Sequence, residues 1–300
     1  MDFLSKFGSM SNRAAALTIF LAWYVAAFVT TLAVQGKLFD TLLYSGKVLL
    51  VALLVMSVMF VVSRVLNRTD VVDAGWPIAF VAMVLYGFMN NPYDVAIGIN
   101  VQTLASGLVI IWGLRLFYAM VGRLRKNSED KRYVELRKNW KGNEAVNTYV
   151  RVFAIQAFLA WVIAASVNHV NVALPQTVTW VAIGGLVIWL VGFVFEAVGD
   201  WQLKRFLANP TNKGKIMARG LWRYTRHPNY FGEVTMWWGI FLVALATPNG
   251  WLAIISPVVI TYLLLFVSGI PMTEQSFENK PGWSVYKRRV SVFFPLPPKT

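Results

Sequence analysis

The segment Gly220–Glu233, which reads GLWRYTRHPNYFGE, holds the densest group of side chains that could bind or activate a ligand. Its donors and acceptors, together with a preceding arginine, are Arg219, Arg223, Tyr224, Arg226, His227, Asn229, Tyr230 and Glu233. Pro228 suits the first turn of a helix, and a helix N-terminus with cationic and amide donors binds phosphate groups. A signal for membrane orientation alone would need only Lys and Arg. The Tyr, His, Asn and Glu side chains at fixed spacing therefore favour a binding site.

Seven ionisable residues lie inside or at the edge of apolar segments, where each costs about 2.5–3.5 kcal/mol to insert. They are Asp70, Asp73, Arg115, Glu196, Asp200, Glu233 and Glu274. Asp70 and Asp73 share a helix face at spacing i,i+3, and Glu196 and Asp200 do so at i,i+4. These two acidic pairs predict a polar cavity that opens to the cytoplasm. Structural alternatives are Asp70 as a helix cap, Asp200 paired with a nearby lysine, and Arg115 as a clamp on a carboxylate.

Long apolar helices must position these side chains. The chain is 57% hydrophobic and 14% charged, whereas a soluble domain carries about 25% charged residues. A membrane span needs about 20 mostly apolar residues. Eight segments qualify, namely 14–35, 46–63, 71–89, 99–121, 151–170, 177–198, 229–247 and 251–271. We therefore expect an all-α, polytopic transmembrane helical bundle with about eight spans and both termini on the cytoplasmic side.

The distribution of basic residues supports this topology. The predicted cytoplasmic loops are 1–13, 64–70, 122–150, 199–228 and 272–300. Together with Arg151 they hold 25 of the 28 Lys and Arg residues, whereas the opposite side holds Lys37 and Lys47 and the last one, Arg115, lies within a span. Cytoplasmic loops of membrane proteins carry such an excess. The net charge of +14 is thus explained by topology and by attraction to anionic lipid, and nucleic acid is not an expected partner.

Composition also excludes several kinds of chemistry. The chain has no Cys, which excludes disulfides, thiol nucleophiles and Cys-ligated metals. Its two histidines, His169 and His227, argue against a multi-histidine metal site, and we expect no metal. The expected partners are membrane lipids and an apolar substrate.

Several segments resemble one known superfamily. Thr225–Glu233 resembles the signature of steroid 5-alpha-reductases, C14 and C7 sterol reductases and their uncharacterised bacterial relatives, a large family of unknown function. Further matching segments, some of them similar to the bacterial relatives in particular, are Asp70–Trp76, Trp112–Leu116, Glu129–Tyr133, Asp200, Gly220–Trp222, and Tyr286–Arg289 with Pro295. The resemblance covers about residues 64–298. Isoprenylcysteine and phospholipid methyltransferases, which are distant kin, also carry an Arg-His-Pro-x-Tyr element.

The resemblance implies a NADPH-dependent reductase of a lipid or steroid-like enone or ring double bond. Positions that match cofactor contacts are Asp200, Tyr224, Asn229, Glu233 and Tyr286. Basic positions in the corresponding surroundings are Lys215, Arg219, Arg226, Arg288 and, on a helix that flanks the cofactor, Arg115. His227 and Tyr230 of the motif complete the expected cofactor-binding set.

The sequence departs from the 5-alpha-reductases at the substrate side. Those enzymes polarise the steroid ketone with a Gln-Glu pair and a Tyr, whereas this chain has no such pair and has Trp112 where the Tyr is expected. Asp73, Asp70 or Tyr118 is the expected acid that protonates or polarises the substrate. A buried carboxylic acid can do so at neutral pH because burial raises its pKa.

Two other functions remain open. One is a membrane methyltransferase that uses S-adenosylmethionine, although its Glu-rich patch is thin here, at 274–278. The other is a non-catalytic lipid-binding protein on the same fold. We expect a single membrane domain, with N-terminal spans and the substrate side in 1–121 and the cofactor-binding half in 122–300. The bacterial relatives favour a bacterial inner membrane over the endoplasmic reticulum.

Overall fold

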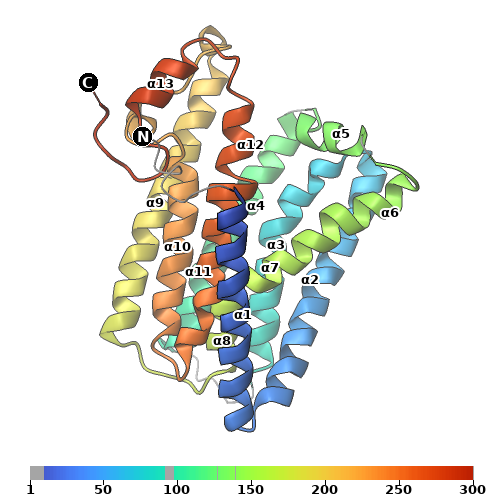
Figure 1. Cartoon of the computed structure of the whole chain (residues 1–300), viewed down its shortest axis with the longest axis vertical. Helices are drawn as coiled ribbons and strands as arrows, with labels where there is room; N and C mark the ends of the chain where they lie inside the picture. The colour runs from blue at the N-terminus through green and yellow to red at the C-terminus, as the bar shows by residue number, and fades with distance from the viewer. Residues whose placement is uncertain (1–9, 92–97, 127, 139, 300) are drawn as a thin grey trace. The chain divides into compact units, whose positions relative to one another are not determined.

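The computed structural model describes residues 10–91, 98–126, 128–138 and 140–299 (Figure 1). In these residues the regular structure is helical, with no strand beyond an isolated bridge between Thr225 and Ser291. The helices are α1 (Met10–Val34), α2 (Leu38–Leu66), α3 (Val72–Met89), α4 (Val101–Lys126), α5 (Lys131–Lys138), α6 (Glu144–Thr148), α7 (Ile155–Ile163), α8 (Ala165–Val172), α9 (Trp180–Ala208), α10 (Pro228–Ala244), α11 (Ile255–Tyr262), α12 (Ile270–Gln275) and α13 (Trp283–Arg289). The all-α prediction is confirmed.

Seven helical segments within the described residues are long and apolar enough to cross a membrane. They are Leu17–Val34, Leu38–Leu66, Thr69–Met89, Val101–Arg125, Glu144–Ile163, Trp180–Ala208 and Gly250–Gln275. The expected span at 229–247 corresponds to α10, whose 17 residues extend about 26 Å and fall just short of a 30 Å hydrocarbon core. The protein is therefore a multi-pass integral membrane protein.

The chain forms two compact units. Unit 1 contains residues 1–27, 183–242 and 257–300, and unit 2 contains residues 28–182 and 243–256. Each unit combines segments that are distant in the sequence. The expected division of roles between 1–121 and 122–300 stays a prediction.

In unit 2, α3 packs between α2 and α4 and also contacts α7 and α8. Its buried face includes Phe80, whose ring meets that of Trp112 on α4 edge to face at 5.3 Å. At the end of α2, Asn67 adopts a left-handed conformation with φ of 52°, which Asn tolerates better than most residues and which ends the helix. The next residues turn into α3, and this turn carries Asp70.

In unit 1, α9 and α10 lie side by side (Figure 1) because glycines remove side chains from their contact. A Cβ atom on Gly232 would lie 2.5 Å from the Glu196 backbone nitrogen and 2.5 Å from the Gly192 carbonyl oxygen. Small residues allow such close approach of membrane helices. This contact places the first turns of α10, which follow the motif, directly against α9.

Candidate functional site

The motif segment before α10 is anchored to α9 by polar contacts. Trp222 Nε1 donates to the Gly199 carbonyl oxygen at 3.0 Å, and the Leu221 N–H donates to Gln202 Oε1 at 3.0 Å. Gly220 has φ of +61°, and a Cβ atom there would lie 2.4 Å from Gln202 Oε1. Glycine is therefore required at this turn.

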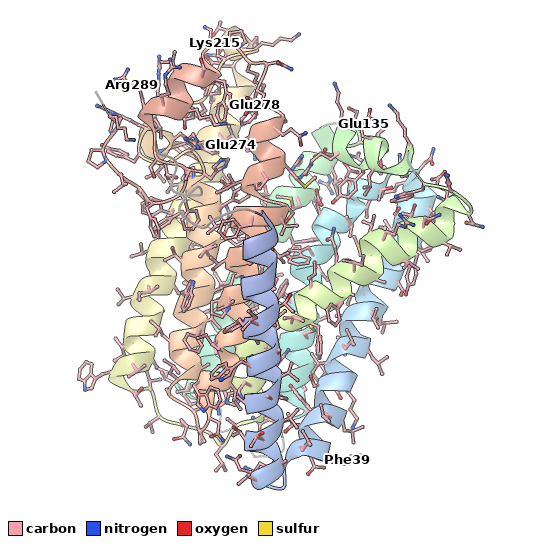
Figure 2. All side chains as sticks on the ribbon, in the orientation of Figure 1. Phe39, Glu135, Lys215, Glu274, Glu278 and Arg289 are labelled. Carbon is pink, nitrogen blue, oxygen red and sulfur yellow. The ribbon has the colours of Figure 1, made fainter. Side chains whose placement is uncertain are left out.

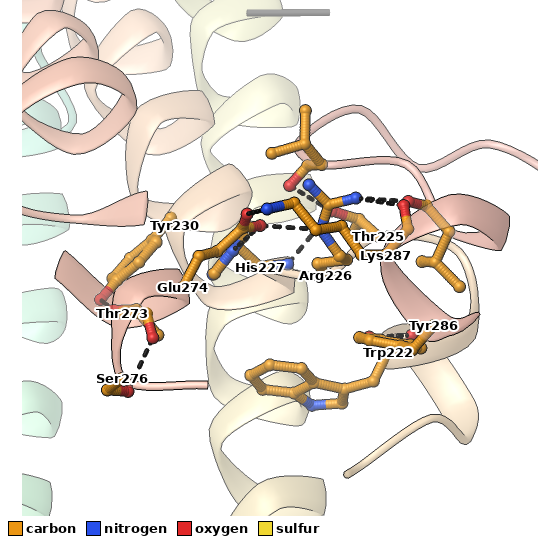
Figure 3. Close-up of polar contacts among 12 residues, drawn as sticks. Trp222, Thr225, Arg226, His227, Tyr230, Thr273, Glu274, Ser276, Tyr286 and Lys287 are labelled. Atoms are coloured by element: carbon orange, nitrogen blue, oxygen red, sulfur yellow. Dashed lines mark hydrogen bonds and ion pairs between the residues drawn. The ribbon is translucent and has the colours of Figure 1, made fainter. Parts of the chain in front are cut away.

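Glu274 lies at the centre of the buried polar contacts in unit 1 (Figure 3). Its Oε1 accepts from Arg226 Nε at 2.7 Å and lies 3.0 Å from His227 Nε2. The Arg226 and His227 side chains are each 2% exposed and that of Glu274 is 11% exposed. We call Arg226, His227 and Glu274 the Glu274 cluster. A buried carboxylate must be paired in this way, because an isolated buried charge is strongly disfavoured.

Arg226 also holds the C-terminal segment. Its Nη1 donates to the carbonyl oxygens of Lys287, at 2.8 Å, and Val290, at 2.9 Å. Its backbone N–H donates to the Ser291 carbonyl oxygen at 2.8 Å. The guanidinium of Arg226 thus joins the segment before α10 to α12, to the last turn of α13 and to the residue after it.

His227 is neutral at neutral pH. Burial lowers the pKa of His227, and the nearby Glu274 carboxylate opposes this only in part, while Arg226 lowers it further. The His227 ring stacks on Tyr230, with centroids 5.4 Å apart and planes at 10°. The Tyr230 hydroxyl in turn lies 3.0 Å from Thr273 Oγ1. Both motif side chains are therefore held against α12.

Tyr286, another expected cofactor contact, is also buried. Its hydroxyl donates to the Trp222 carbonyl oxygen at 2.6 Å, and burial raises its pKa (Figure 3). Arg226, His227, Tyr230 and Tyr286 therefore form one packed end of unit 1. Figure 2 shows Lys215, Glu274 and Arg289 at this same end.

Other expected cofactor residues remain available at this end of unit 1. Lys215, Arg219 and Arg288 are exposed, as is Arg223, and among the described residues none of these four cations has a carboxylate partner. Asn229 Oδ1 is buried and has no hydrogen-bond partner among the residues that the structure describes. The remaining members of the set are Tyr224, which is 42% exposed, and Asp200 and Glu233, which are half-buried. Exposed cations can bind the phosphates of a ligand, and a buried acceptor can take a hydrogen bond from a donor on a ligand.

A second polar group lies in unit 2 and joins two motifs. Asp70 is buried and accepts from Arg68 Nε and Nη2, each at 2.7 Å, and from the Asp130 N–H at 3.0 Å. Glu129 accepts from the Thr69 N–H at 2.6 Å and from the Arg137 guanidinium. The segments Asp70–Trp76 and Glu129–Tyr133 are thus bound to each other.

The electrostatics of this unit 2 group match the contacts. Burial raises the pKa of Glu129, but hydrogen bonds from Arg137 and Thr69 outweigh it, so the pKa is lowered. The same balance lowers the pKa of Asp130, where Arg132 supplies the hydrogen bonds. Both carboxylates are ionised at neutral pH.

The expected acid Asp73 has a tyrosine partner. The Tyr133 hydroxyl donates to Asp73 Oδ1 at 2.6 Å, and burial raises the pKa of Tyr133. Tyr118, another expected acid, is 79% exposed, and Arg115 is half-buried, both on α4. We did not expect Tyr133 to participate, although it ends the Glu129–Tyr133 motif.

The described residues contain no group of three or more His, Cys, Asp and Glu side chains placed to hold a metal ion.

We did not expect Glu274 to lie beside the motif residues Arg226 and His227. The available signal was its position as an ionisable residue at the end of an apolar span.

Comparisons with known proteins identify a family and two relatives. A family model described as "Protein of unknown function (DUF1295)" matches residues 59–290. The chain is 25% identical to the uncharacterized protein C594.04c of Schizosaccharomyces pombe over 285 residues, which cover 82% of this chain and 78% of that protein. It is 45% identical over 53 residues, or 18% of each chain, to a probable O-methyltransferase, ustE, of Ustilaginoidea virens. No solved structure matches.

Proposed function

Because the chain belongs to the DUF1295 family, whose function is unknown, we propose an activity from its site: a NADPH-dependent reductase of a carbon–carbon double bond in an apolar lipid or steroid-like substrate. The proposal rests on two features of one end of unit 1: exposed cations without a carboxylate partner among the described residues, and a buried acceptor without a hydrogen-bond partner. The cations are Lys215, Arg219, Arg223 and Arg288, and the acceptor is Asn229 Oδ1. NADPH carries phosphates and a carboxamide donor and so fits both features.

In this proposal each residue has a defined role. Arg219 and its neighbouring cations bind the phosphates, and Asn229 accepts a hydrogen bond from the carboxamide. Glu233, one turn after Asn229 on α10, accepts a second hydrogen bond from the nicotinamide or its ribose. The Glu274 cluster does not meet the cofactor but fixes the start of α10, so that Asn229 and Glu233 keep their positions.

When bound, NADPH supplies a hydride to one alkene carbon and is oxidised to NADP⁺. The second alkene carbon then needs a proton. The expected acids Asp73, Asp70 and Tyr118 are the candidates for supplying it. Replacing the residue that donates the proton should abolish reduction and leave NADPH affinity unchanged.

The first test measures binding with purified, detergent-solubilised protein. NADPH should raise the melting temperature more than NADH does, because only NADPH carries a 2′-phosphate for the cations. Asn229→Ala should lower the affinity for both nucleotides about tenfold, since one hydrogen bond is lost. Single Gln variants of Lys215, Arg219, Arg223 and Arg288 should lower the affinity for NADPH. At least one of them should lower the affinity for NADPH more than that for NADH. Lys141→Gln, an exposed cation of unit 2, is the matched control. No stabilisation by either nucleotide would refute the proposal.

A methyltransferase that uses S-adenosylmethionine is the second candidate, because of the 45% identical segment shared with a probable O-methyltransferase. S-adenosylmethionine has no phosphate, so it leaves the four cations without a role. Stabilisation by S-adenosylmethionine together with indifference to NADPH would establish this candidate instead. Indifference to both would favour a non-catalytic lipid-binding protein.

A further inference from the structure

Unit 2 contains a cavity at the N-terminal end of α2, at the other end of that helix from the Arg68–Asp70 contacts. Its volume is about 270 Å³, and it is lined by Asp40, Leu43, Tyr44, Lys47, Tyr86 and Asn90. Figure 2 labels Phe39, the residue before Asp40, at this end of the unit. The distribution of Lys and Arg predicts that this end faces away from the cytoplasm.

The cavity carries one charge of each sign. Asp40 and Lys47 are exposed, and among the described residues neither has an ion-pair partner. They are seven positions apart on α2, so they lie on one face with a rise of about 10 Å between them. The long Lys47 side chain can extend along this face toward Asp40. An isolated pair of this kind can bind a ligand with both an ammonium and an anionic group.

Two tyrosines form the aromatic wall of the cavity. The rings of Tyr44 and Tyr86 are 6.3 Å apart and tilted by 33°. The Tyr44 hydroxyl is buried and has no hydrogen-bond partner within the described part of the chain. The Tyr44 hydroxyl packs against Gly87, and a Cβ atom built on Gly87 would lie 2.5 Å from the hydroxyl oxygen. Tyrosine faces attract ammonium groups, and a buried unpaired hydroxyl is stabilised when a ligand supplies a partner.

The position along α2 points to a lipid as the source of this ligand. The 29 residues of α2 extend about 43 Å, more than the 30 Å hydrocarbon core, so its end turns reach the headgroup layer. From the cavity, an exposed apolar ridge runs along the helix through Leu43, Leu50, Leu54 and Val61. A headgroup in the cavity would therefore have its acyl chain beside this ridge.

We propose that this cavity binds the headgroup of a phospholipid that carries a primary ammonium and a phosphate, as phosphatidylethanolamine does. The ammonium pairs with Asp40 and faces the Tyr44 and Tyr86 rings, and the phosphate pairs with Lys47. The site is independent of the cofactor site proposed in unit 1. The site makes unit 2 selective for one class of lipid in the membrane leaflet that faces away from the cytoplasm.

The test compares lipids in mixed micelles, with the melting temperature of the full chain as the readout and no nucleotide present. Phosphatidylethanolamine should raise the melting temperature more than phosphatidylglycerol or phosphatidylcholine. Asp40→Asn and Lys47→Gln should each reduce that shift at least by half. Lys37→Gln, the other Lys on this side, should keep it. Equal shifts with all three lipids, or wild-type shifts in both variants, would overturn the proposal.

Two further measurements test the role of the Tyr44 hydroxyl and the contribution of the acyl chain. Tyr44→Phe removes only an unpartnered hydroxyl, so it should leave the lipid-free melting temperature unchanged and weaken the lipid effect. Free phosphoethanolamine has the same charged groups without the acyl chain. It should bind at least tenfold more weakly than the lipid; equal binding would show that the ligand is a soluble molecule and would overturn the assignment to phospholipid.

Discussion

His227 and Glu274 are 47 positions apart in the chain, yet His227 Nε2 lies 3.0 Å from Glu274 Oε1. The same oxygen accepts from Arg226 Nε at 2.7 Å. A motif in front of one helix is thereby fixed by a carboxylate on another. Arg226 and His227, which were both expected to bind the cofactor, have an internal carboxylate as their partner.

Removing this carboxylate should be costly. Glu274→Gln leaves the buried Arg226 guanidinium without its counter-charge, and breaking a buried pair in this way destabilises a protein by about 3–5 kcal/mol. The measurement is denaturant or thermal unfolding in detergent. Glu278→Gln is the matched control, because Glu278 pairs with Lys287 at 3.0 Å but is 55% exposed, so its loss should cost less than about 1 kcal/mol. Equal effects of the two variants would contradict this account of the cluster.

The neutral state of His227 predicts a pH dependence of stability. Burial holds the pKa of His227 in the folded protein below its usual value of 6.5, whereas in the unfolded chain its pKa is about 6.5. The unfolded state then binds more protons at acid pH, so the free energy of unfolding should fall as the pH drops below about 6.5. His227→Gln should remove this part of the dependence. His169→Gln, which leaves the His227–Glu274 contact intact, should retain it. An unchanged pH profile in His227→Gln would rule out this origin.

The sequence predicts the helices well but not the partners inside the Glu274 cluster. Apolar runs and the placement of Lys and Arg are local features, and the bilayer imposes a minimum span length, so the spans are readable from composition. The α10 span was expected to be longer than its 17 residues because the apolar run continues past Ala244. The helix ends there because the Thr247–Gly250 turn follows, in which Pro248 cannot continue a helix and Asn249 is left-handed.

The polar contacts depend on tertiary packing, which spacing alone does not determine. Glu274 could be identified as an ionisable group in an apolar span, but its partners lie 47 and 48 positions away. Asp73 was expected as an acid, and its partner Tyr133 lies 60 positions away. In both cases the sequence identified a group that needs a partner and could not say which residue supplies it.

The contact between α9 and α10 makes a prediction about glycine. In Gly232→Ala the new Cβ atom would lie 2.5 Å from backbone atoms of Gly192 and Glu196, which cannot move as a flexible side chain can. Overpacking of this kind costs about 1–3 kcal/mol, and the helices must separate to relieve it. Gly184→Ala on α9 is the control, since its Cβ atom would meet nothing within 4 Å. The melting temperatures should therefore separate the two variants; a stable Gly232→Ala protein would show that α9 and α10 do not approach this closely.

The orientation in the membrane can be tested directly because the chain has no Cys. Ser128 is exposed in a segment predicted to face the cytoplasm, and Lys37 is exposed in the turn between α1 and α2, predicted to face the other side. Single variants Ser128→Cys and Lys37→Cys provide one reporter on each side. A membrane-impermeant thiol reagent added to intact cells should label Lys37→Cys and should label Ser128→Cys only after the membrane is permeabilised. The physical reason is the excess of Lys and Arg in the segment around Ser128, which favours retention in the cytoplasm. The reverse labelling pattern would invert the topology, and with it the assignment of the unit 2 cavity to the outer leaflet.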